Sequence, residues 1–120
     1  MVVDDGPQIR ATAVHMFQEL GCEVFDAYNG HGALKIIEAH PEIQVLFADI
    51  RMPGMSGPEL AHVARRLRPD LRIVLTSGYV SGDEVPNDIP FVPKPWRTED
   101  FVQVVGSAPL KGKCQTGKAA

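Results

Sequence analysis

The sequence predicts an α/β fold in which five parallel strands form one doubly wound sheet with helices on both faces. Short apolar runs alternate along the chain with segments of helical periodicity, and glycine and proline mark the boundaries between them. The run from Ile43 to Ala48 is too short for a typical helix and rich in β-branched and aromatic residues, which is typical of a strand covered on both faces. Right-handed crossovers then bring the strands into one parallel sheet.

The first strand is expected at Met1 to Val3, a very short apolar start that resembles a strand whose beginning is missing. A helix is predicted from Pro7, because proline suits the first helical position, and Gly21 is expected to end it. Its buried face is predicted from apolar residues at helical spacing: Ile9, Ala13, Met16, Phe17 and Leu20.

The second strand is expected at Glu23 to Tyr28, where Val24 and Phe25 are flanked by smaller or polar residues. Asn29 and Gly30 are typical of a turn. A helix is predicted from about His31 to Ala39, with Pro41 after its end. The apolar residues of its predicted buried stripe are Ala33, Leu34, Ile36 and Ile37.

The third strand ends on Asp49, and Pro58 opens the next predicted helix. The fourth strand is expected at Leu71 to Leu75. The helix between them has apolar residues that fit the i, i+3, i+4, i+7 pattern: Leu60, Val63, Ala64 and Leu67.

The segment from Tyr79 to Asp88 contains Gly82 and Pro86, so any helix there is expected to be short and weak. Ile89 to Val92 is predicted as the fifth strand, and Thr98 is expected to cap a last helix that Gly106 and Pro109 stop early. We therefore expect one domain over residues 1–105. Residues 106–120 are expected to be a polar tail that is disordered or left over from cloning.

Composition excludes several classes of protein. With 120 residues, a hydrophobic share of 44% and a charged share of 22%, the chain is expected to be one globular domain with its own core. The net charge of −3 argues against nucleic-acid binding by this domain. No apolar run approaches the roughly 20 residues that span a bilayer, and the first residues do not resemble a signal peptide. Membrane insertion is therefore not expected. A cytoplasmic location is expected, and Cys22 and Cys114 should be reduced there.

Chemically suggestive residues follow four of the five predicted strands. Asp4 and Asp5 come after the first strand, Asp49 after the third, Thr76 after the fourth and Lys94 after the fifth. Ligands of open α/β sheets bind beyond the carboxyl ends of the strands, and parallel strands share that edge. This convergence, more than any single motif, indicates a functional site.

The chemistry of such a site follows from its charges. Three carboxylates at one edge repel one another, and a hard divalent ion such as Mg²⁺, which prefers oxygen ligands, relieves that repulsion. With Mg²⁺ bound, Lys94 can neutralise phosphoryl oxygens and Thr76 can donate a hydrogen bond to them. An aspartate carboxylate such as Asp49 can act as a nucleophile and form an acyl phosphate.

Over about residues 1 to 105 the sequence resembles the response-regulator receiver domain of two-component signalling, and its motifs are most like those of receivers attached to hybrid sensor kinases. The resemblance implies a flavodoxin-like sheet with strand order 2-1-3-4-5. It is carried by four motifs that together are highly specific: Val2 to Asp5, Asp49 to Gly57, Val74 to Gly78 and Phe91 to Pro95.

The resemblance also implies a role for each site residue. Asp49 would accept a phosphoryl group from a histidine kinase or phosphotransfer protein, and the domain would catalyse only its own phosphorylation and dephosphorylation rather than act as a dedicated enzyme. Mg²⁺ would be held by Asp5, Asp49 and the backbone carbonyl of Arg51, with Asp4 acting through water. The remaining implied roles are Thr76 as switch hydroxyl, Lys94 as phosphate-contacting amine, Phe91 as switch aromatic and a cis peptide before Pro95 that aims the lysine.

The sequence departs from the receiver pattern in places. Gly6 stands where such domains usually carry another acid, and Phe91 lacks the hydroxyl of the commoner tyrosine. One alternative is a degenerate receiver that binds partners without phosphorylation. A less favoured alternative is a phosphatase of the haloacid-dehalogenase type, whose second aspartate would fall at Arg51. Turnover of a phosphate ester would distinguish the phosphatase from a receiver.

Overall fold

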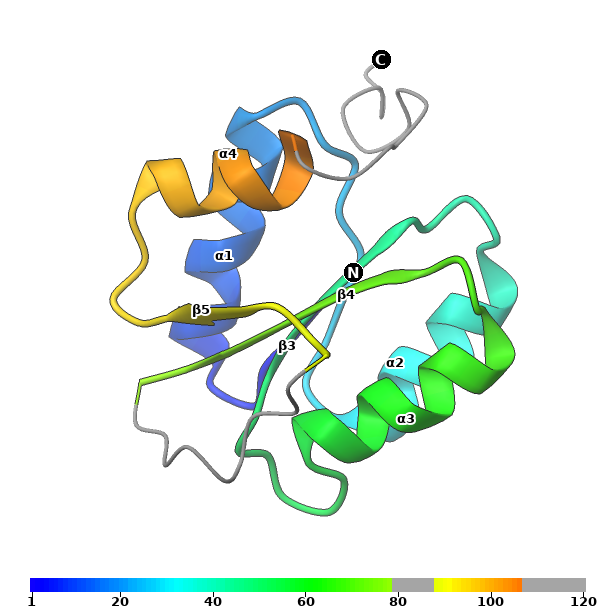
Figure 1. Cartoon of the computed structure of the whole chain (residues 1–120). Coiled ribbons are helices and arrows are strands. Elements are labelled where there is room, and N and C mark those ends of the chain that lie inside the picture. The colour runs from blue at the N-terminus through cyan, green and yellow to red at the C-terminus, as the bar shows by residue number, and fades with distance from the viewer. Residues whose placement is uncertain (79–87, 107–120) are drawn as a thin grey trace.

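The computed structural model describes residues 1–78 and 88–106, which form one five-stranded parallel sheet in the order β2-β1-β3-β4-β5 (Figure 1). Both the predicted α/β class and the predicted strand order 2-1-3-4-5 are confirmed. The elements are β1 (Val2–Val3), α1 (Pro7–Glu19), β2 (Asp26–Ala27), α2 (Gly30–Ala39), β3 (Val45–Asp49), α3 (Gly57–Leu67), β4 (Arg72–Ser77), β5 (Phe91–Pro93) and α4 (Thr98–Gly106).

Several predicted boundaries shift by a few residues. β2 is much shorter than expected, because only Asp26 and Ala27 pair in register with β1. α2 starts at Gly30, where a turn was predicted, because the Asn29 side chain caps the helix by accepting a hydrogen bond from the backbone N–H of Gly32. α4 includes Thr98 as its first residue rather than as its cap. The helix predicted within residues 79–88 and the predicted tail lie outside the described residues, apart from Asp88 and Gly106.

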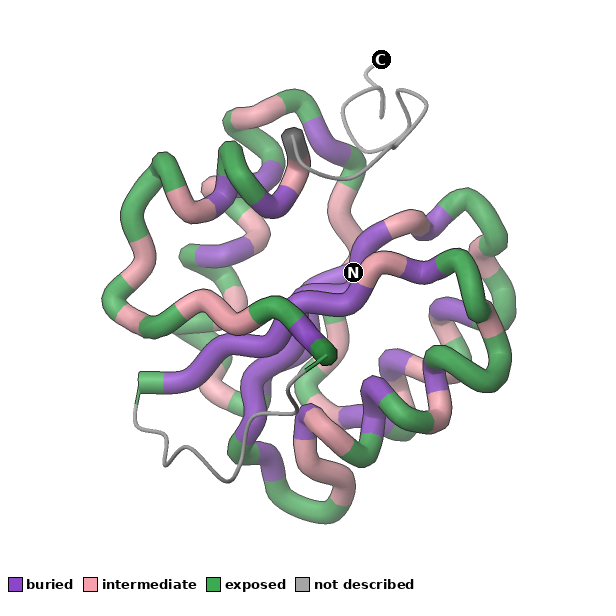
Figure 2. Tube along the Cα trace, in the orientation of Figure 1, coloured by how far each residue is buried: buried purple, intermediate pink, exposed green. Residues whose placement is uncertain are grey.

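Two helices cover each face of the sheet, α1 and α4 on one side and α2 and α3 on the other (Figure 1). Side chains of β3 alternate between the two layers: Leu46 and Ala48 join the cluster under α2 and α3, whereas Val45 and Phe47 join the cluster under α1 and α4. All five residues of β3 are buried, as Figure 2 shows for the centre of the sheet. The predicted two-sided burial of this strand is therefore confirmed.

The layer under α1 and α4 is aromatic. Phe17, Phe47 and Phe101 pack together with ring centroids 4.6 to 5.4 Å apart, and Trp96 lies 5.5 Å from both Phe47 and Phe101. Edge-to-face contacts of this kind add to the burial energy of the rings and fix their orientation. This aromatic cluster (Phe17, Phe47, Trp96 and Phe101) supports the carboxyl-terminal edge of the sheet from one side.

Two predicted core positions are wrong. Ile9 in the first turn of α1 and Leu67, the last residue of α3, are 40% and 42% exposed. Helical periodicity identifies the apolar face of a helix but not how far along that face the sheet reaches. None of the helices in the described part of the chain has the length and apolar character that a bilayer crossing requires.

Candidate functional site

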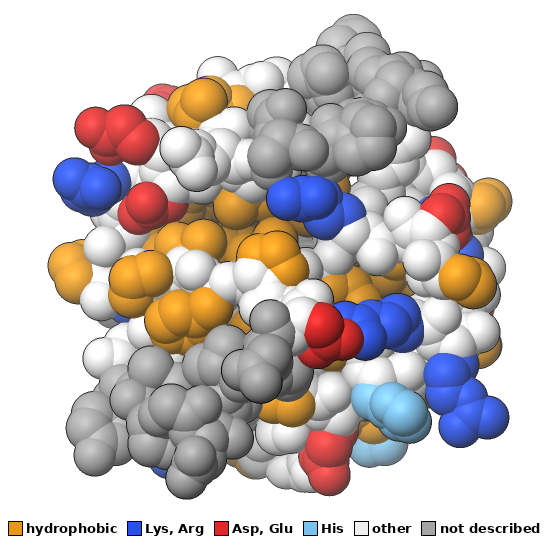
Figure 3. Space-filling model, in the orientation of Figure 1, with side chains coloured by type: hydrophobic (Ala, Val, Ile, Leu, Met, Phe, Trp, Pro, Cys, Tyr) orange, Lys and Arg blue, Asp and Glu red, His pale blue; other side chains and the backbone are white. Residues whose placement is uncertain are grey.

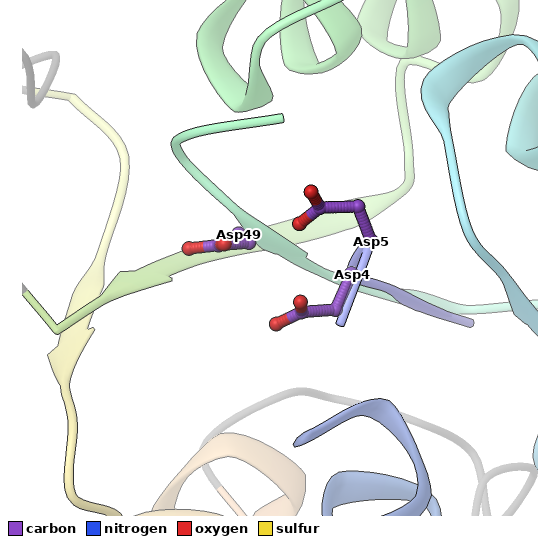
Figure 4. Close-up of side chains that lie close together, drawn as sticks. All are labelled: Asp4, Asp5 and Asp49. Atoms are coloured by element: carbon purple, nitrogen blue, oxygen red, sulfur yellow. The ribbon is translucent and has the colours of Figure 1, made fainter. Parts of the chain in front are cut away.

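The carboxylates of Asp4, Asp5 and Asp49 meet at the carboxyl-terminal edge of the sheet, where the sequence predicted a site (Figure 4). One oxygen of each lies within 4.8 Å of the others. Asp4 and Asp49 are buried and Asp5 is exposed. β1 and β3 are neighbours in the sheet, so the residues that end these two strands are brought together by strand pairing itself.

Backbone contacts and one arginine hold Asp4 in place. Its N–H donates to the carbonyl of Ala27, and its Oδ1 accepts a hydrogen bond of 2.9 Å from the N–H of Gly6. Arg10 donates from Nη1 to the carbonyl of Asp4 and pairs through Nε with Asp26, the first residue of β2, at 3.0 Å. Sequence reasoning missed Arg10. The signal available was an arginine one helical turn into the helix that follows the two aspartates.

Lys94 brings the counter-charge. Its Nζ lies 3.3 Å from Asp4 Oδ2 and 3.6 Å from Asp49 Oδ1. Its backbone N–H donates to the carbonyl of Ser77, which fixes the lysine beside the end of β4, and the Lys94–Pro95 peptide is cis. The predicted convergence of the strand-one and strand-three aspartates with this lysine is therefore present in the structure.

The electrostatics of Asp49 are unusual. Burial raises the pKa of its carboxyl above the ordinary 3.8, and the nearby Asp4 and Asp5 raise it further, while Lys94 and a hydrogen bond from the Ile50 backbone lower it. Within the described residues, its buried Oδ1 has no hydrogen-bond partner, since Lys94 Nζ is beyond hydrogen-bonding distance. The carboxylate is thus poorly compensated and ready to bind a cation or react.

We predict that Asp49→Asn stabilises the protein at pH 7 without metal, by about 1 kcal/mol, because it removes a buried charge. The pKa of Asp49 in the folded protein is raised above its ordinary value of 3.8. Keeping this carboxylate ionised therefore lowers the free energy of unfolding at pH values above the folded-state pKa. This loss of stability disappears as the pH falls through the folded-state pKa towards 3.8. The advantage of the Asn variant should follow the same course. Urea unfolding of both proteins between pH 7 and pH 4 measures it, and equal stability at pH 7 would contradict the prediction.

The loop after β3 presses closely against the site. Gly57, the first residue of α3, donates its N–H to the carbonyl of Ile50 at 2.8 Å. A Cβ at this position would fall 2.8 Å from Ile50 Cα, so only glycine fits. Ser56 caps α3 in a capping box with Glu59. Arg51, the predicted carbonyl ligand, lies in this loop with an exposed side chain, two residues after Asp49.

Thr76 is the register partner of Asp49 on the neighbouring strand β4, and it is only 1% exposed. Its Oγ1 accepts a hydrogen bond of 2.7 Å from the indole Nε1 of Trp96. Lys94 Nζ lies 5.5 Å from the centroid of the same indole ring. Sequence reasoning missed Trp96, which is partly buried in the structure and finds a partner for its N–H.

Phe91 lies on β5 opposite Leu75 and is partly buried. It packs against the cluster under α2 and α3, whereas Trp96 packs against the cluster under α1 and α4. Thr76 itself pairs in register with Val92 on β5, so its direct aromatic contact is the hydrogen-bonded indole of Trp96.

The donor set fits a hard divalent cation. Three carboxylates supply oxygen ligands and a single lysine faces them, and the buried Asp49 Oδ1 has no hydrogen-bond donor within the described residues. Another hollow, of about 230 Å³, lies between β5 and α4, where hydrophobic side chains gather in Figure 3. Its lining mixes apolar residues such as Val74 and Val104 with Asp100, and it contains none of the three clustered carboxylates.

Comparison with known proteins covers most of the chain. Residues 1–105 match the family model of the response regulator receiver domain. The sensor kinase CckA of Brucella abortus is 30% identical over 88% of this chain, which spans only 12% of that kinase. The response regulator receiver protein CpdR of the same organism is 28% identical over 88% of this chain and 91% of its own length. The solved receiver domain of NtrX from Brucella abortus is 25% identical with a TM-score of 0.80, covering 92% of this chain and 96% of that domain.

Proposed function

Because this chain belongs to the response regulator receiver domain family, we propose that Asp49 is the residue that accepts its phosphoryl group. The observation that carries this proposal is the poorly compensated, buried Asp49 carboxylate between Lys94 and two further aspartates. The ionised carboxylate has the lone pair that a nucleophile needs, and Lys94 favours that ionised form, whereas Asp4 and Asp5 oppose it.

In the proposed reaction, a carboxylate oxygen of Asp49 forms a bond to phosphorus while the bond from phosphorus to the donor breaks. Lys94 contributes positive charge beside Asp49 Oδ1, and Thr76 contributes a hydroxyl from the adjacent strand position. Asp5, Asp49 and the backbone carbonyl of Arg51 would hold Mg²⁺, with Asp4 acting through water, and the bound ion would supply further positive charge for the phosphoryl oxygens. Catalysis would thus consist of positioning and charge stabilisation.

The proposed donor is the phosphohistidine of a histidine kinase or of a phosphotransfer protein. The relatives support this class of partner, since one is a sensor kinase and another is the sporulation initiation phosphotransferase F of Bacillus subtilis, 30% identical over 66% of this chain. The chemistry of the donor fits the site as well, because a phosphohistidine presents a negatively charged group that Lys94 can attract.

Intact-protein mass spectrometry tests the function. After incubation with a small-molecule phosphodonor and Mg²⁺, the mass should rise by one phosphate, and the gain should need the metal. A receiver should take up at most one phosphate for each chain, whereas a phosphatase of the haloacid-dehalogenase type would turn over a phosphate ester many times. No mass gain under saturating donor and Mg²⁺, together with no turnover of a phosphate ester, would leave the phosphorylation-independent receiver.

A further prediction concerns the metal. Asp5→Asn should weaken Mg²⁺ binding about tenfold or more, because it replaces a charged oxygen ligand at the exposed side of the site. The Gly6→Glu variant should bind Mg²⁺ as tightly as the wild type or more tightly. A Cβ at position 6 would lie 3.4 Å from Asp4 Oδ1, so the new glutamate adds a carboxylate close to the site. Isothermal titration of the wild type and both variants measures the effect. An unchanged affinity for Asp5→Asn would remove Asp5 from the ligand set.

A further inference from the structure

The indole of Trp96 lies beside two groups of the proposed phosphoryl site, Thr76 on β4 and Lys94 directly after β5. Its Nε1 donates to Thr76 Oγ1 at 2.7 Å, and its ring lies 5.5 Å from Lys94 Nζ. The rings of Phe47 and Phe101, in the layer under α1 and α4, have their centroids 5.5 Å from that of the indole and fix its orientation. Trp96 is the only tryptophan of the chain.

The direction of the hydrogen bond follows from the chemistry of the two groups. An indole N–H can only donate, so Thr76 Oγ1 must accept. A hydroxyl has one proton and two lone pairs, and the bond from Trp96 uses a lone pair and leaves the proton for another acceptor. Within the described residues, the indole is the hydrogen-bond partner of Oγ1.

Phosphoryl oxygens are acceptors, so Thr76 can serve them only as a donor. Thr76 and Asp49 are register partners, and neighbouring strands lie about 4.8 Å apart, so a phosphoryl group on Asp49 is within reach of that hydroxyl. In a chain from indole N–H through hydroxyl O–H to phosphoryl oxygen, each hydrogen bond polarises the next and strengthens it.

We propose that Trp96 is a positioning residue of the phosphoryl site: its indole N–H holds Thr76 as a hydrogen-bond donor towards the group carried by Asp49. The inference rests on the proposed function, since it needs a phosphoryl group at Asp49. It extends that function by adding a residue from the aromatic cluster whose effect runs through Thr76.

Trp96→Phe isolates the N–H, because phenylalanine keeps an aromatic ring against Phe47, Phe101 and Lys94. The probe is beryllofluoride with Mg²⁺, a phosphoryl mimic, added to the full chain and followed by NMR. Trp96→Phe should weaken its binding about fivefold, the size of one neutral hydrogen bond. In a Thr76→Ala background, the same substitution should change the affinity by less than about twofold, since the partner of the indole is already gone.

The NMR resonance of the single indole N–H, that of Trp96, gives a second readout, which would not respond if the role of Trp96 were purely structural. It should shift when beryllofluoride binds to the wild type, and that response should be lost in Thr76→Ala. An unchanged affinity of Trp96→Phe, or an equal loss in both backgrounds, would overturn the positioning role while leaving phosphorylation of Asp49 intact. Failure of the wild type to bind beryllofluoride would instead overturn the proposed function, and the inference with it.

Discussion

Replacing Asp49 with Asn is expected to abolish phosphorylation completely, the largest effect of any single substitution in this chain. The carboxamide has no ionised oxygen to attack phosphorus, although its shape and burial are nearly those of the carboxylate. Intact mass after treatment with a small-molecule phosphodonor and Mg²⁺ should show the one-phosphate gain in the wild type and none in the variant.

A matched control is Asp70→Asn, which changes the same chemical group on an exposed side chain in the turn before β4. This variant should gain the phosphate as the wild type does. A full gain in Asp49→Asn would place the acceptor elsewhere and refute the proposal. Far-UV circular dichroism spectra of the two variants should match that of the wild type. Such a match would show that the missing mass increase in Asp49→Asn does not come from unfolding.

Gly57→Ala is expected to destabilise the protein by about 3 kcal/mol, because the added Cβ has no room. It would lie 2.8 Å from Ile50 Cα and also overlap the carbonyl of Asp49, and both neighbours are backbone that cannot rotate away. Relief of the overlap must push the end of β3 or the start of α3, so the rate of phosphorylation at Asp49 should also fall several-fold. Urea unfolding and timed mass measurements would record the two effects.

Gly54→Ala provides the comparison within the same loop. Gly54 has a φ of 83°, which strains any other residue, but nothing lies within 4 Å of the position of its missing Cβ. We therefore expect a loss of only about 1 kcal/mol and an unchanged rate of phosphorylation. Equal losses for the two variants would mean that the close approach at Gly57 relaxes without cost.

The fold was largely predictable from sequence because β3 and β4 are short apolar runs rich in β-branched or aromatic residues, whereas α3 has a clear helical period. Prediction failed where tertiary structure sets the outcome. Val24 and Phe25 have strand propensity, but β1 offers only two residues to pair with, so β2 stays at Asp26–Ala27. Similarly, Asn29 and Gly30 suit a turn in sequence, and the cap from Asn29 to Gly32 turns them into a helix start.

The site was predictable to the extent that its residues end strands. Asp4, Asp49 and Lys94 meet because parallel strands share an edge, and that rule needs no coordinates. Arg10 reaches the site from α1 through the carbonyl of Asp4, a contact that its place one turn into the helix made foreseeable. Trp96 reaches it from the loop after β5 through Thr76, 20 residues away in sequence, and no spacing rule connects that pair.

The unequal make-up of the two layers has an optical consequence. The sole tryptophan and the three tightly packed phenylalanines lie under α1 and α4, while the buried cluster under α2 and α3 is aliphatic. Intrinsic fluorescence and near-ultraviolet dichroism therefore report mainly on one half of the molecule. Far-ultraviolet dichroism reports on the helices of both halves. Agreement between these signals during unfolding would show that the two layers melt as one cooperative unit, and a gap between them would show that each layer can open separately.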